Sequence, residues 1–261
     1  MKALIKLGGT LLDSAETRAR LAGEIAQVVG DGVEAVVVHG GGKQMTRYLA
    51  DHGVATRFID GLRVTTPEVL DAVLKVFAGS VNKELVAALI AAGVRAVGLC
   101  GMDALLTEAC RMSEELGYVG RPVRSNPELL NLLMRNSFLP VVACVAGDRS
   151  GRYFNVNADQ MAASLAAAMQ VDKLLFLTDV DGVRGADGGI CSRLDLAACR
   201  NLIDTGVAAG GMRAKLDAAM EAIQSGLAEA VIAPGASAGI LPRLLAGDEI
   251  GTRLIKSDAA Q

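Results

Sequence analysis

Two glycine-rich segments, each at the end of an apolar run, contain the residues best suited to chemistry in this sequence. The first run ends in Lys6-Leu7-Gly8-Gly9, and the second ends in His39, which Gly40–Gly42 follow. Glycines leave backbone N–H groups unshielded, and a helix that starts there adds the positive end of its dipole, so phosphates and carboxylates bind well. Two such segments and a lysine inside a strand indicate phosphoryl chemistry.

Later segments carry polar side chains that also have ordinary explanations. Asn155 and Asn157 precede an alanine-rich stretch, with Asn157 as a natural N-cap and Asp159 in the first helical turn, where the helix dipole favours a carboxylate. Asp179 follows a buried strand at the edge where open α/β sheets bind ligands, and Lys215 follows two glycines. Taken alone, capping explains Asp159 as well as a functional role does, but it leaves Asn155 unexplained. A polar turn is the favoured explanation of Asp179, and solvated surface that of Lys215.

The glycine spacing excludes two common nucleotide-binding motifs. Walker A requires G-x-x-x-x-G-K-[ST], but Val37 stands five residues before Gly42, and Gln44 follows Lys43. The dinucleotide fingerprint G-x-G-x-x-G fits neither glycine segment. If phosphate is bound here, another fold binds it.

Composition narrows the class of protein. The chain has 261 residues, enough for one large α/β domain or two small lobes, and 51% are hydrophobic against 21% charged, which excludes a disordered protein. A net charge of −3, 3% aromatic residues and no tryptophan exclude a nucleic-acid-binding surface. No apolar run reaches the length of a membrane span, and no signal region precedes the first strand.

Cysteine and histidine usage indicates a reducing compartment. The five cysteines form no C-x-x-C pair and there are two histidines, so we expect no zinc site and a cytoplasmic location.

The apolar runs and helical patterns alternate along the chain. Strands are expected at Ala3–Leu7, Glu34–His39, Arg95–Leu99, Leu139–Cys144, Lys173–Thr178 and Ala230–Ala233. Helices are expected at Ala15–Val29, Gln44–Asp51, Pro67–Ala92, Pro127–Asn136, Ala158–Met169 and Gly211–Ser225. This alternation predicts an α/β fold, a three-layer αβα sandwich with a mainly parallel central sheet.

Other segments are less regular. Met102–Asn126 is irregular and contains Glu114–Gly120, which looks like a hairpin, as does Asp148–Phe154. Ser14 and the Thr65-Thr66-Pro67 segment look like helix starts. We expect two lobes that share one sheet: residues 1–170 to bind an acceptor and residues 171–261 to bind nucleotide, with a soft boundary near 170–180.

Taken in order, the motifs resemble the amino acid kinase family, and within it the acetylglutamate kinases. Each motif is weak alone, but their collinear order over nearly the whole chain is specific. They are K-L-G-G at Lys6–Gly9, H-G-G-G at His39–Gly42, G-L-R-V-T at Gly61–Thr65, V-N-K-E-L at Val81–Leu85, E-L-G-Y-V-G at Glu115–Gly120, N-V-N-A-D at Asn155–Asp159, T-D-V-D-G-V at Thr178–Val183, G-G-M-R-A-K at Gly210–Lys215 and I-G-T at Ile250–Thr252.

The resemblance implies a kinase that transfers the γ-phosphoryl of ATP to the side-chain carboxylate of N-acetyl-L-glutamate, a step of arginine biosynthesis. It implies that Gly41 and Gly42 hold the acceptor with backbone N–H groups, Arg63 binds its α-carboxylate, and Asn155 binds its acyl-amino end. The planar fork of arginine suits a carboxylate because it can donate to both oxygens at once.

The resemblance also implies the catalytic groups. Lys6 and Lys215 would flank the moving phosphoryl group, Asp159 would hold the two lysines in place, and Gly8 and Gly9 would donate N–H groups to the bridging oxygens. Phosphoryl transfer passes through a loose transition state, so alignment and charge stabilisation carry the catalysis.

The nucleotide is expected on the second half of the chain. Mg²⁺ would arrive bound to phosphates and water, so no protein ligand to a metal is predicted. The residues implied for nucleotide binding are Gly8, Asp179, Val180, Asp181, Gly182, Val183, Arg184, Val207, Ala208, Ala209, Gly210, Gly211 and Met212.

Departures from the family pattern leave alternatives open. Ser80 replaces a lysine common in relatives. Met1 leaves no room for the extra helix of relatives that arginine inhibits, so we expect an arginine-insensitive homodimer joined through Pro67–Ala92. The alternatives are a sibling kinase for N-acetylaminoadipate or another N-acylated amino acid, and a non-catalytic sensor of nucleotide or amino acid. The Gly61–Thr65 motif favours a free α-carboxylate over a carrier protein.

Overall fold

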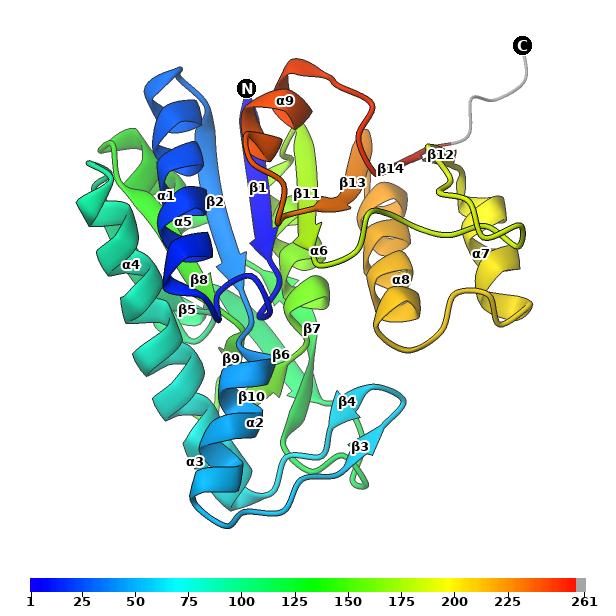
Figure 1. Ribbon diagram of the computed structural model, residues 1–261. Coiled ribbons are helices and arrows are strands. Elements are labelled where there is room, and N and C mark those ends of the chain that lie inside the picture. Colours follow the sequence, from blue (N-terminus) through cyan, green and yellow to red (C-terminus); the bar gives the residue numbers. More distant parts are fainter. Residues whose placement is uncertain (257–261) are drawn as a thin grey trace.

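A single sheet of eight strands lies at the centre of the computed structural model, which describes residues 1–256 (Figure 1). Its strands are β1 (Lys2–Leu7), β2 (Glu34–His39), β5 (Ala96–Cys100), β8 (Leu139–Ala143), β11 (Lys173–Thr178), β12 (Arg193–Leu194), β13 (Glu229–Pro234) and β14 (Thr252–Ile255). Their order is β12-β14-β13-β11-β1-β2-β8-β5. All neighbours from β13 to β5 are parallel, while β14 runs antiparallel to β13 and β12 runs parallel to β14.

The central strands are apolar on both faces because helices cover both. In β1, Ala3, Leu4, Ile5 and Leu7 are fully buried, as a parallel strand between two helical layers requires. β1 pairs with β11 on one side and with β2 on the other. The carboxyl ends of these three strands therefore meet at one edge of the sheet.

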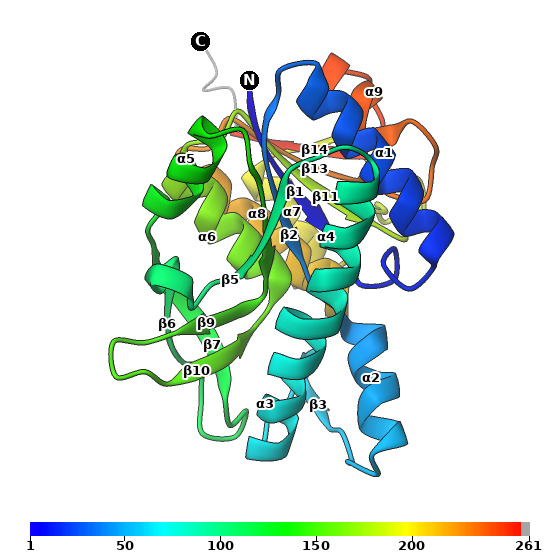
Figure 2. The same cartoon turned by 90° about the vertical axis from the view of Figure 1, so that its left-hand side faces the viewer.

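Helices form a layer on each side of the sheet (Figure 2). One layer contains α1 (Ala15–Gly30), α4 (Asn82–Ala91) and α9 (Ile240–Ala246), and the other contains α5 (Glu128–Arg135), α6 (Ala158–Met169) and α8 (Gly210–Gln224), with α7 (Leu196–Asp204) against α8. The predicted three-layer arrangement with a mainly parallel sheet is confirmed.

Polar side chains start the helices where the sequence predicts. Ser14 Oγ accepts from the Thr17 N–H at 3.3 Å, and Thr66 Oγ1 accepts from the Val69 N–H at the same distance. Asn157 Oδ1 accepts the N–H groups of Asp159 and Gln160 at 2.8 and 3.2 Å. The last cap fixes Asp159 in the first turn of α6, as expected.

The long helix predicted over Pro67–Ala92 is interrupted. It consists of α3 (Pro67–Val73), a π-helical segment (Leu74–Val81) and α4. α2 (Gly42–Asp51) packs against both α3 and the π segment. Wider π turns mark functional sites in many helices, and no feature of the apolar pattern signals one here.

The irregular regions form a small closed barrel and a separate hairpin. The barrel contains β6 (Thr107–Arg111), β7 (Val119–Ser125), β9 (Val145–Gly147) and β10 (Tyr153–Val156), preceded by a 3₁₀ turn (Asp103–Leu105), and the hairpin contains β3 (Phe58–Ile59) and β4 (Leu62–Arg63). The hairpin predicted at Asp148–Phe154 is confirmed, because β9 and β10 pair antiparallel. The barrel, α7, α9, β12 and β14 were not expected from the sequence.

Candidate functional site

Three charged side chains from distant parts of the chain meet at the carboxyl edge of the sheet. Lys6 lies near the end of β1, Asp159 in the first turn of α6, and Lys215 in the second turn of α8. Lys6 Nζ lies 2.6 Å from Asp159 Oδ1, and Lys215 Nζ lies 3.6 Å from Asp159 Oδ2. The carboxylate therefore bridges two ammonium groups, each on its own oxygen.

The side chains of this triad (Lys6, Asp159 and Lys215) are largely buried, which strengthens the interactions between their charges. The side chains of Lys6 and Asp159 are each 7% exposed, and that of Lys215 is 16% exposed. Burial alone raises the pKa of Asp159, but the charges of Lys6 and Lys215 outweigh it and hold that pKa below its ordinary value. The ionised carboxylate attracts both ammonium groups and so offsets their mutual repulsion. Two positive charges and one negative charge leave a net positive centre for an anion.

The two glycine segments touch each other beside the triad. A Cβ on Gly9 would lie 2.8 Å from the Gly42 nitrogen, so only glycine allows this approach. Within residues 1–256, the N–H groups of Gly9, Gly41 and Gly42 have no protein acceptor. The N–H of Gly8 differs from the expectation, because it donates to the Leu177 carbonyl at 2.9 Å.

A glutamine links the two glycine segments. Gln44, in the first turn of α2, donates from Nε2 to the Gly9 carbonyl at 3.2 Å. Because α2 begins at Gly42 and no acid lies in its first turn, the positive end of its dipole faces the glycines. The free N–H groups and the dipole together favour an anion at this point.

A cleft of about 230 Å³ opens from the triad toward β4 and β10. It is lined by the residues expected to bind the acceptor, Gly41, Gly42, Arg63 and Asn155, together with Lys6, Gly9 and Asp159. Lys215 does not line this cleft but reaches Asp159 from the α8 side. The structure thus brings the acceptor residues and most of the triad into one cavity.

Arg63 is held on several sides and free on one. Its Nη2 donates to Thr46 Oγ1 at 2.7 Å, and its guanidinium lies 4.6 Å from the centre of the Phe58 ring. Its Nη1 is buried and has no hydrogen-bond partner within the part of the chain that the structure describes. A buried donor without a partner costs about 1–3 kcal/mol, so this group is suited to an anionic ligand in the cleft.

Asn155 and Arg63 are connected through a threonine that the sequence reasoning missed. Asn155 Nδ2 donates to Thr65 Oγ1 at 3.0 Å, and the same hydroxyl donates to the Arg63 carbonyl at 2.9 Å. The alternation of Arg63 and Thr65 along an extended segment was a usable signal. No such signal marked the apolar residues that line the cleft, which include Phe58, Leu62, Phe77, Val119 and Cys144.

The segments expected to bind nucleotide follow β11 and lead into α8. Val180 in the first segment and Val207 in the second are both 40% exposed, so their side chains are accessible to a ligand. The Val183 N–H donates to Thr252 Oγ1 at 2.8 Å, so the I-G-T motif supports the first segment. In the second, the Ala208 N–H already donates to the Leu202 carbonyl at 2.8 Å.

The other residues expected to bind nucleotide lie in the same two segments. Asp179, Asp181 and Arg184 are exposed while Gly182 is buried, and Ala209, Gly210, Gly211 and Met212 form the start of α8. Gly210 has φ of +51°, a conformation that favours glycine at this turn into the helix.

Within residues 1–256, no group of three His, Cys, Asp or Glu side chains is placed to hold a metal ion. No helix in this range is long and apolar enough to cross a membrane.

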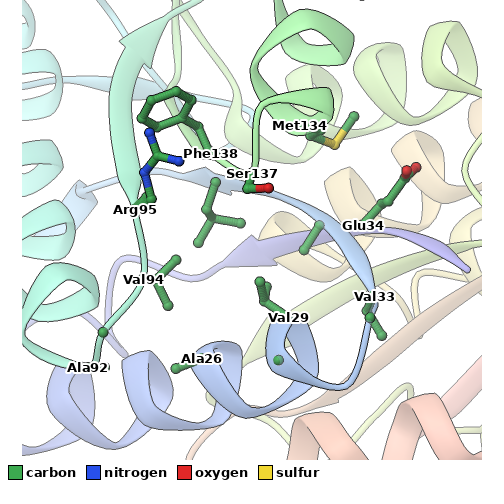
Figure 3. Close-up of a pocket in the computed structure, with 15 residues that line it drawn as sticks. Ala26, Val29, Val33, Glu34, Ala92, Val94, Arg95, Met134, Ser137 and Phe138 are labelled. Carbon is green, nitrogen blue, oxygen red and sulfur yellow. The ribbon is translucent and has the colours of Figure 1, made fainter.

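A second cavity, of about 410 Å³, lies at the opposite edge of the sheet (Figure 3). Its wall is mainly apolar, with Ala26, Val29 and Val94 among its residues, and the Arg95 guanidinium stacks on Phe138 at 4.0 Å. Charged groups do not converge on it as they do on the triad. The cleft at the carboxyl edge is therefore the better candidate for an active site.

One serine has the sequence spacing of a hydrolase nucleophile, but its surroundings exclude this role. Gly235-Ala-Ser237-Ala-Gly239 matches G-x-S-x-G between β13 and α9. The only two histidines bond elsewhere: His39 to Gly40 and Asn82, and His52 to Tyr48. Neither is bonded to Ser237 in residues 1–256, so the base of a hydrolytic triad is missing.

Comparison with known proteins agrees with this geometry. The model of the amino acid kinase family matches residues 1–234. An acetylglutamate kinase of Solibacter usitatus (strain Ellin6076) is 58% identical, over 98% of this chain and 99% of that protein. One of Koribacter versatilis (strain Ellin345) is 40% identical over the same shares of the two chains.

A solved structure with a similar fold is N-acetylglutamate synthase from Neisseria gonorrhoeae complexed with coenzyme A and N-acetyl-glutamate. Its TM-score is 0.87 at 26% identity, and the match covers 98% of this chain but 59% of that one. Carbamate kinase from Giardia lamblia bound to AMP-PNP has a TM-score of 0.73 at 20% identity over 98% of both chains, which shows a shared fold. From the family match and its close relatives, the chain belongs to the amino acid kinase family.

Proposed function

We propose that this chain phosphorylates the side-chain carboxylate of N-acetyl-L-glutamate with ATP and gives N-acetylglutamyl 5-phosphate, in arginine biosynthesis. The observation that carries the proposal is the convergence of Lys6, Asp159 and Lys215 beside a cleft with a free, buried arginine nitrogen. The name of the relatives at 58% and 40% identity supports the choice of acceptor.

The acceptor has two carboxylates, and the cleft has two anion-binding features. Arg63 Nη1 binds the α-carboxylate, and Asn155 binds the acyl-amino end. The reacting carboxylate then lies at the N–H groups of Gly41 and Gly42, close to Lys6, which lines the same cavity. Because a carboxylate with an ordinary pKa near 4.3 is already ionised at neutral pH, no general base is required. The only histidine near the glycines is buried, which fits this chemistry.

The transfer needs alignment and positive charge. One carboxylate oxygen forms a bond to the γ-phosphorus while the bond from that phosphorus to the β,γ-bridging oxygen breaks, and ADP leaves with those electrons. Lys6 and Lys215 stabilise the charge on the equatorial oxygens, and Asp159 holds both ammonium groups in position. Gly9 donates its free N–H to the same group.

ATP lies against the segments 179–184 and 207–212, with its phosphates at the start of α8. Mg²⁺ fits this site when held by phosphates and water, because Asp159, the carboxylate nearest the phosphates, is already paired with two lysines. The ion would neutralise phosphate charge. In this proposal residues 1–170 bind the acceptor and residues 171–261 bind the nucleotide, although Lys215 acts at their junction.

We also propose a cytoplasmic homodimer. The five cysteines are free thiols, as a reducing compartment favours. The proposed contact is the helix over Pro67–Ala92, where Ile90 of α4 is 57% exposed.

The test is turnover with a panel of acceptors. Purified enzyme, ATP and Mg²⁺ are incubated with N-acetylglutamate, N-acetylaminoadipate, N-succinylglutamate or N-acetylaspartate, and hydroxylamine traps any acyl phosphate. We expect the highest kcat/KM with N-acetylglutamate. Preference for N-acetylaminoadipate would identify the sibling kinase, and binding of ATP without turnover on any acceptor would identify a sensor.

A further inference from the structure

His39 closes β2 directly before the glycine loop and takes no part in the cleft. Its ring is fully buried. Nδ1 lies 2.8 Å from the Gly40 carbonyl oxygen, and Nε2 lies 3.0 Å from the side-chain nitrogen of Asn82. Buried polar atoms need partners, and each ring nitrogen has one. The function proposed above leaves both His39 and Asn82 without a role.

The hydrogen-bond network fixes which ring nitrogen carries the proton. Asn82 Nδ2 also lies 3.0 Å from the Val141 carbonyl on β8. A carbonyl only accepts, so the amide nitrogen of Asn82 must face Val141. Its second hydrogen points to His39 Nε2 at 3.0 Å, which lies closer than the Leu99 carbonyl at 3.5 Å. Nε2 is therefore the acceptor, and Nδ1–H donates to the Gly40 carbonyl.

Burial keeps the ring in this neutral state. Removal from water lowers the pKa of His39 to about 4, although the bond to Gly40 acts in the opposite direction. Protonated Nε2 would face a second donor at Asn82, which the geometry does not accommodate. The Nδ1–H donor is thus present throughout the physiological pH range.

The bond to Gly40 determines where the next N–H points. Residues 1–256 contain no cis peptide bond, and in a trans peptide the C=O and N–H groups point in opposite directions. Because the Gly40 carbonyl is turned toward His39, the Gly41 N–H points away from the ring. Gly41 lines the cleft, and its N–H has no protein acceptor in the described residues.

We infer that His39 and Asn82 are positioning residues that aim the Gly41 N–H at the reacting carboxylate of the acceptor. The inference rests on the proposed function and deepens it. His39 fixes the Gly40–Gly41 peptide plane, and Asn82 fixes the tautomer and rotation of His39. Neither residue touches the substrate.

The π-helical segment supports the pair at two points. Asn82 follows it directly, and Phe77 within it packs so closely on Gly41 that a Cβ there would lie 2.9 Å from the ring. Gly98 on β5 leaves room for the amide, because a Cβ there would lie 2.0 Å from Asn82 Oδ1. The π-helical segment thus packs on the glycine loop through Phe77. Through Asn82, which follows the segment, it also fixes the position of the histidine that orients this loop.

The test compares two uncharged replacements of His39. In His39→Asn the amide nitrogen takes the place of Nδ1 and can still donate to Gly40. In His39→Gln it reaches toward the Nε2 position and leaves the Gly40 carbonyl without its donor. Both variants lose the imidazole, so a merely structural role predicts equal effects on activity.

We expect His39→Gln to lower kcat/KM for N-acetylglutamate roughly 30-fold, since loss of a positioned oxyanion donor costs about 100-fold or more. Because only one donor is misdirected in His39→Gln, its KM for ATP should stay within about twofold of the wild-type value. His39→Asn should retain most of the activity. Urea unfolding confirms that both variants are folded. The inference would be overturned if both variants lost kcat/KM for N-acetylglutamate to the same extent. It would also be overturned if the KM for ATP rose in His39→Gln by as much as kcat/KM fell.

A measurement that does not need turnover separates this inference from the proposed function. In ¹H–¹⁵N spectra, His39→Gln should shift the Gly41 amide resonance while the Gly9 resonance stays in place, and His39→Asn should leave both near their wild-type positions. An unchanged Gly41 resonance in His39→Gln would overturn the inference. A wild-type enzyme inactive on every acceptor would overturn the proposed function, while the spectra would still decide the role of His39.

Discussion

The Arg63 guanidinium is ready for a carboxylate before any ligand binds. Thr46 and the Phe58 ring hold it in place, and its buried Nη1 has no partner in residues 1–256. Burial lowers the pKa of Arg63, but the group stays charged because a guanidinium keeps its proton in proteins. Little rotational freedom is then lost on binding, which favours affinity.

Replacement of Arg63 by lysine should therefore weaken acceptor binding. Lysine keeps the charge but cannot hold Thr46 and a carboxylate at once, so the KM for the acceptor should rise about tenfold or more, with the KM for ATP nearly unchanged. Steady-state kinetics measure both values. Arg47→Lys is the matched control, because Arg47 is exposed and pairs with Asp13. An unchanged acceptor KM in Arg63→Lys would remove Arg63 from the site.

His39 also makes stability depend on pH. Its pKa falls from 6.5 to about 4 on folding, so the unfolded chain binds more protons between these values. The stabilisation by the neutral ring is complete above pH 6.5 and is lost as the pH falls toward 4, to a total of about 3 kcal/mol.

The measurement is urea unfolding of the wild type and of His39→Asn between pH 7.5 and 4.5. We expect the wild type to lose more stability than the variant over this range. Parallel curves would show that His39 is not held neutral by the fold.

At the scale of elements, two loops must stay in contact for the site to form. The loop after β1 and the start of α2 lie so close together that a Cβ on Gly9 would meet backbone atoms of Gly41 and Gly42. A side chain between them cannot be accommodated by rotation. The loops would have to separate.

Gly9→Ala should therefore impair the kinase without unfolding it. We expect kcat to fall about 100-fold, since the N–H donors move out of alignment. Gly23→Ala is the control, because Gly23 lies within α1 and a Cβ there meets nothing within 4 Å. That variant should keep full activity and gain up to about 1 kcal/mol of stability. Equal activity of Gly9→Ala and wild type would mean that the loop contact is not needed.

Local signals explain which elements the sequence could predict. The bounds of α6 match the expected Ala158–Met169, because the Asn157 cap and the apolar stretch both lie within the segment. The π segment was missed because its widened turns leave the helical pattern of residues unchanged. α9 was missed because it has seven residues and contains Pro242, and β12 because two residues carry no periodicity.

The sequence could select residues for the candidate site but not the contacts between them. Lys6, Asp159 and Lys215 could be selected by resemblance, yet the distances between them depend on the packing of α6 against α8. The occupied N–H of Gly8 depends on the neighbouring strand β11. Phe77 and Cys144 line the cleft through tertiary packing, and nothing in their local sequence distinguishes them from core residues.

At the scale of the whole molecule, the sheet order explains why the chemistry lies at its centre. β1 carries Lys6 and lies between β2, which leads into the acceptor glycines, and β11, which leads into the proposed nucleotide segment. Figure 1 shows the strands that follow β11 on one side of β1 and the strands from the first part of the chain on the other. Lys6 is thus placed where the two substrates are expected to meet.

We predict that the protein is a homodimer, and its mass in solution tests this. Sedimentation at micromolar concentration should give about 54 kDa, twice the 26.9 kDa of one chain, and added arginine should change neither the mass nor the activity. A species near the mass of one chain, or inhibition by arginine, would contradict it.

The most direct test of the account is the single-turnover rate of phosphoryl transfer in Lys6→Ala and Lys215→Ala, with saturating ATP, Mg²⁺ and N-acetylglutamate. Each variant should transfer the phosphoryl group about 100- to 1,000-fold more slowly than wild type and should bind ATP with nearly unchanged affinity. Lys75→Ala, which removes an exposed lysine paired with Asp71, should react at the wild-type rate. Transfer at the wild-type rate in either variant, with only weaker ATP binding, would contradict the account.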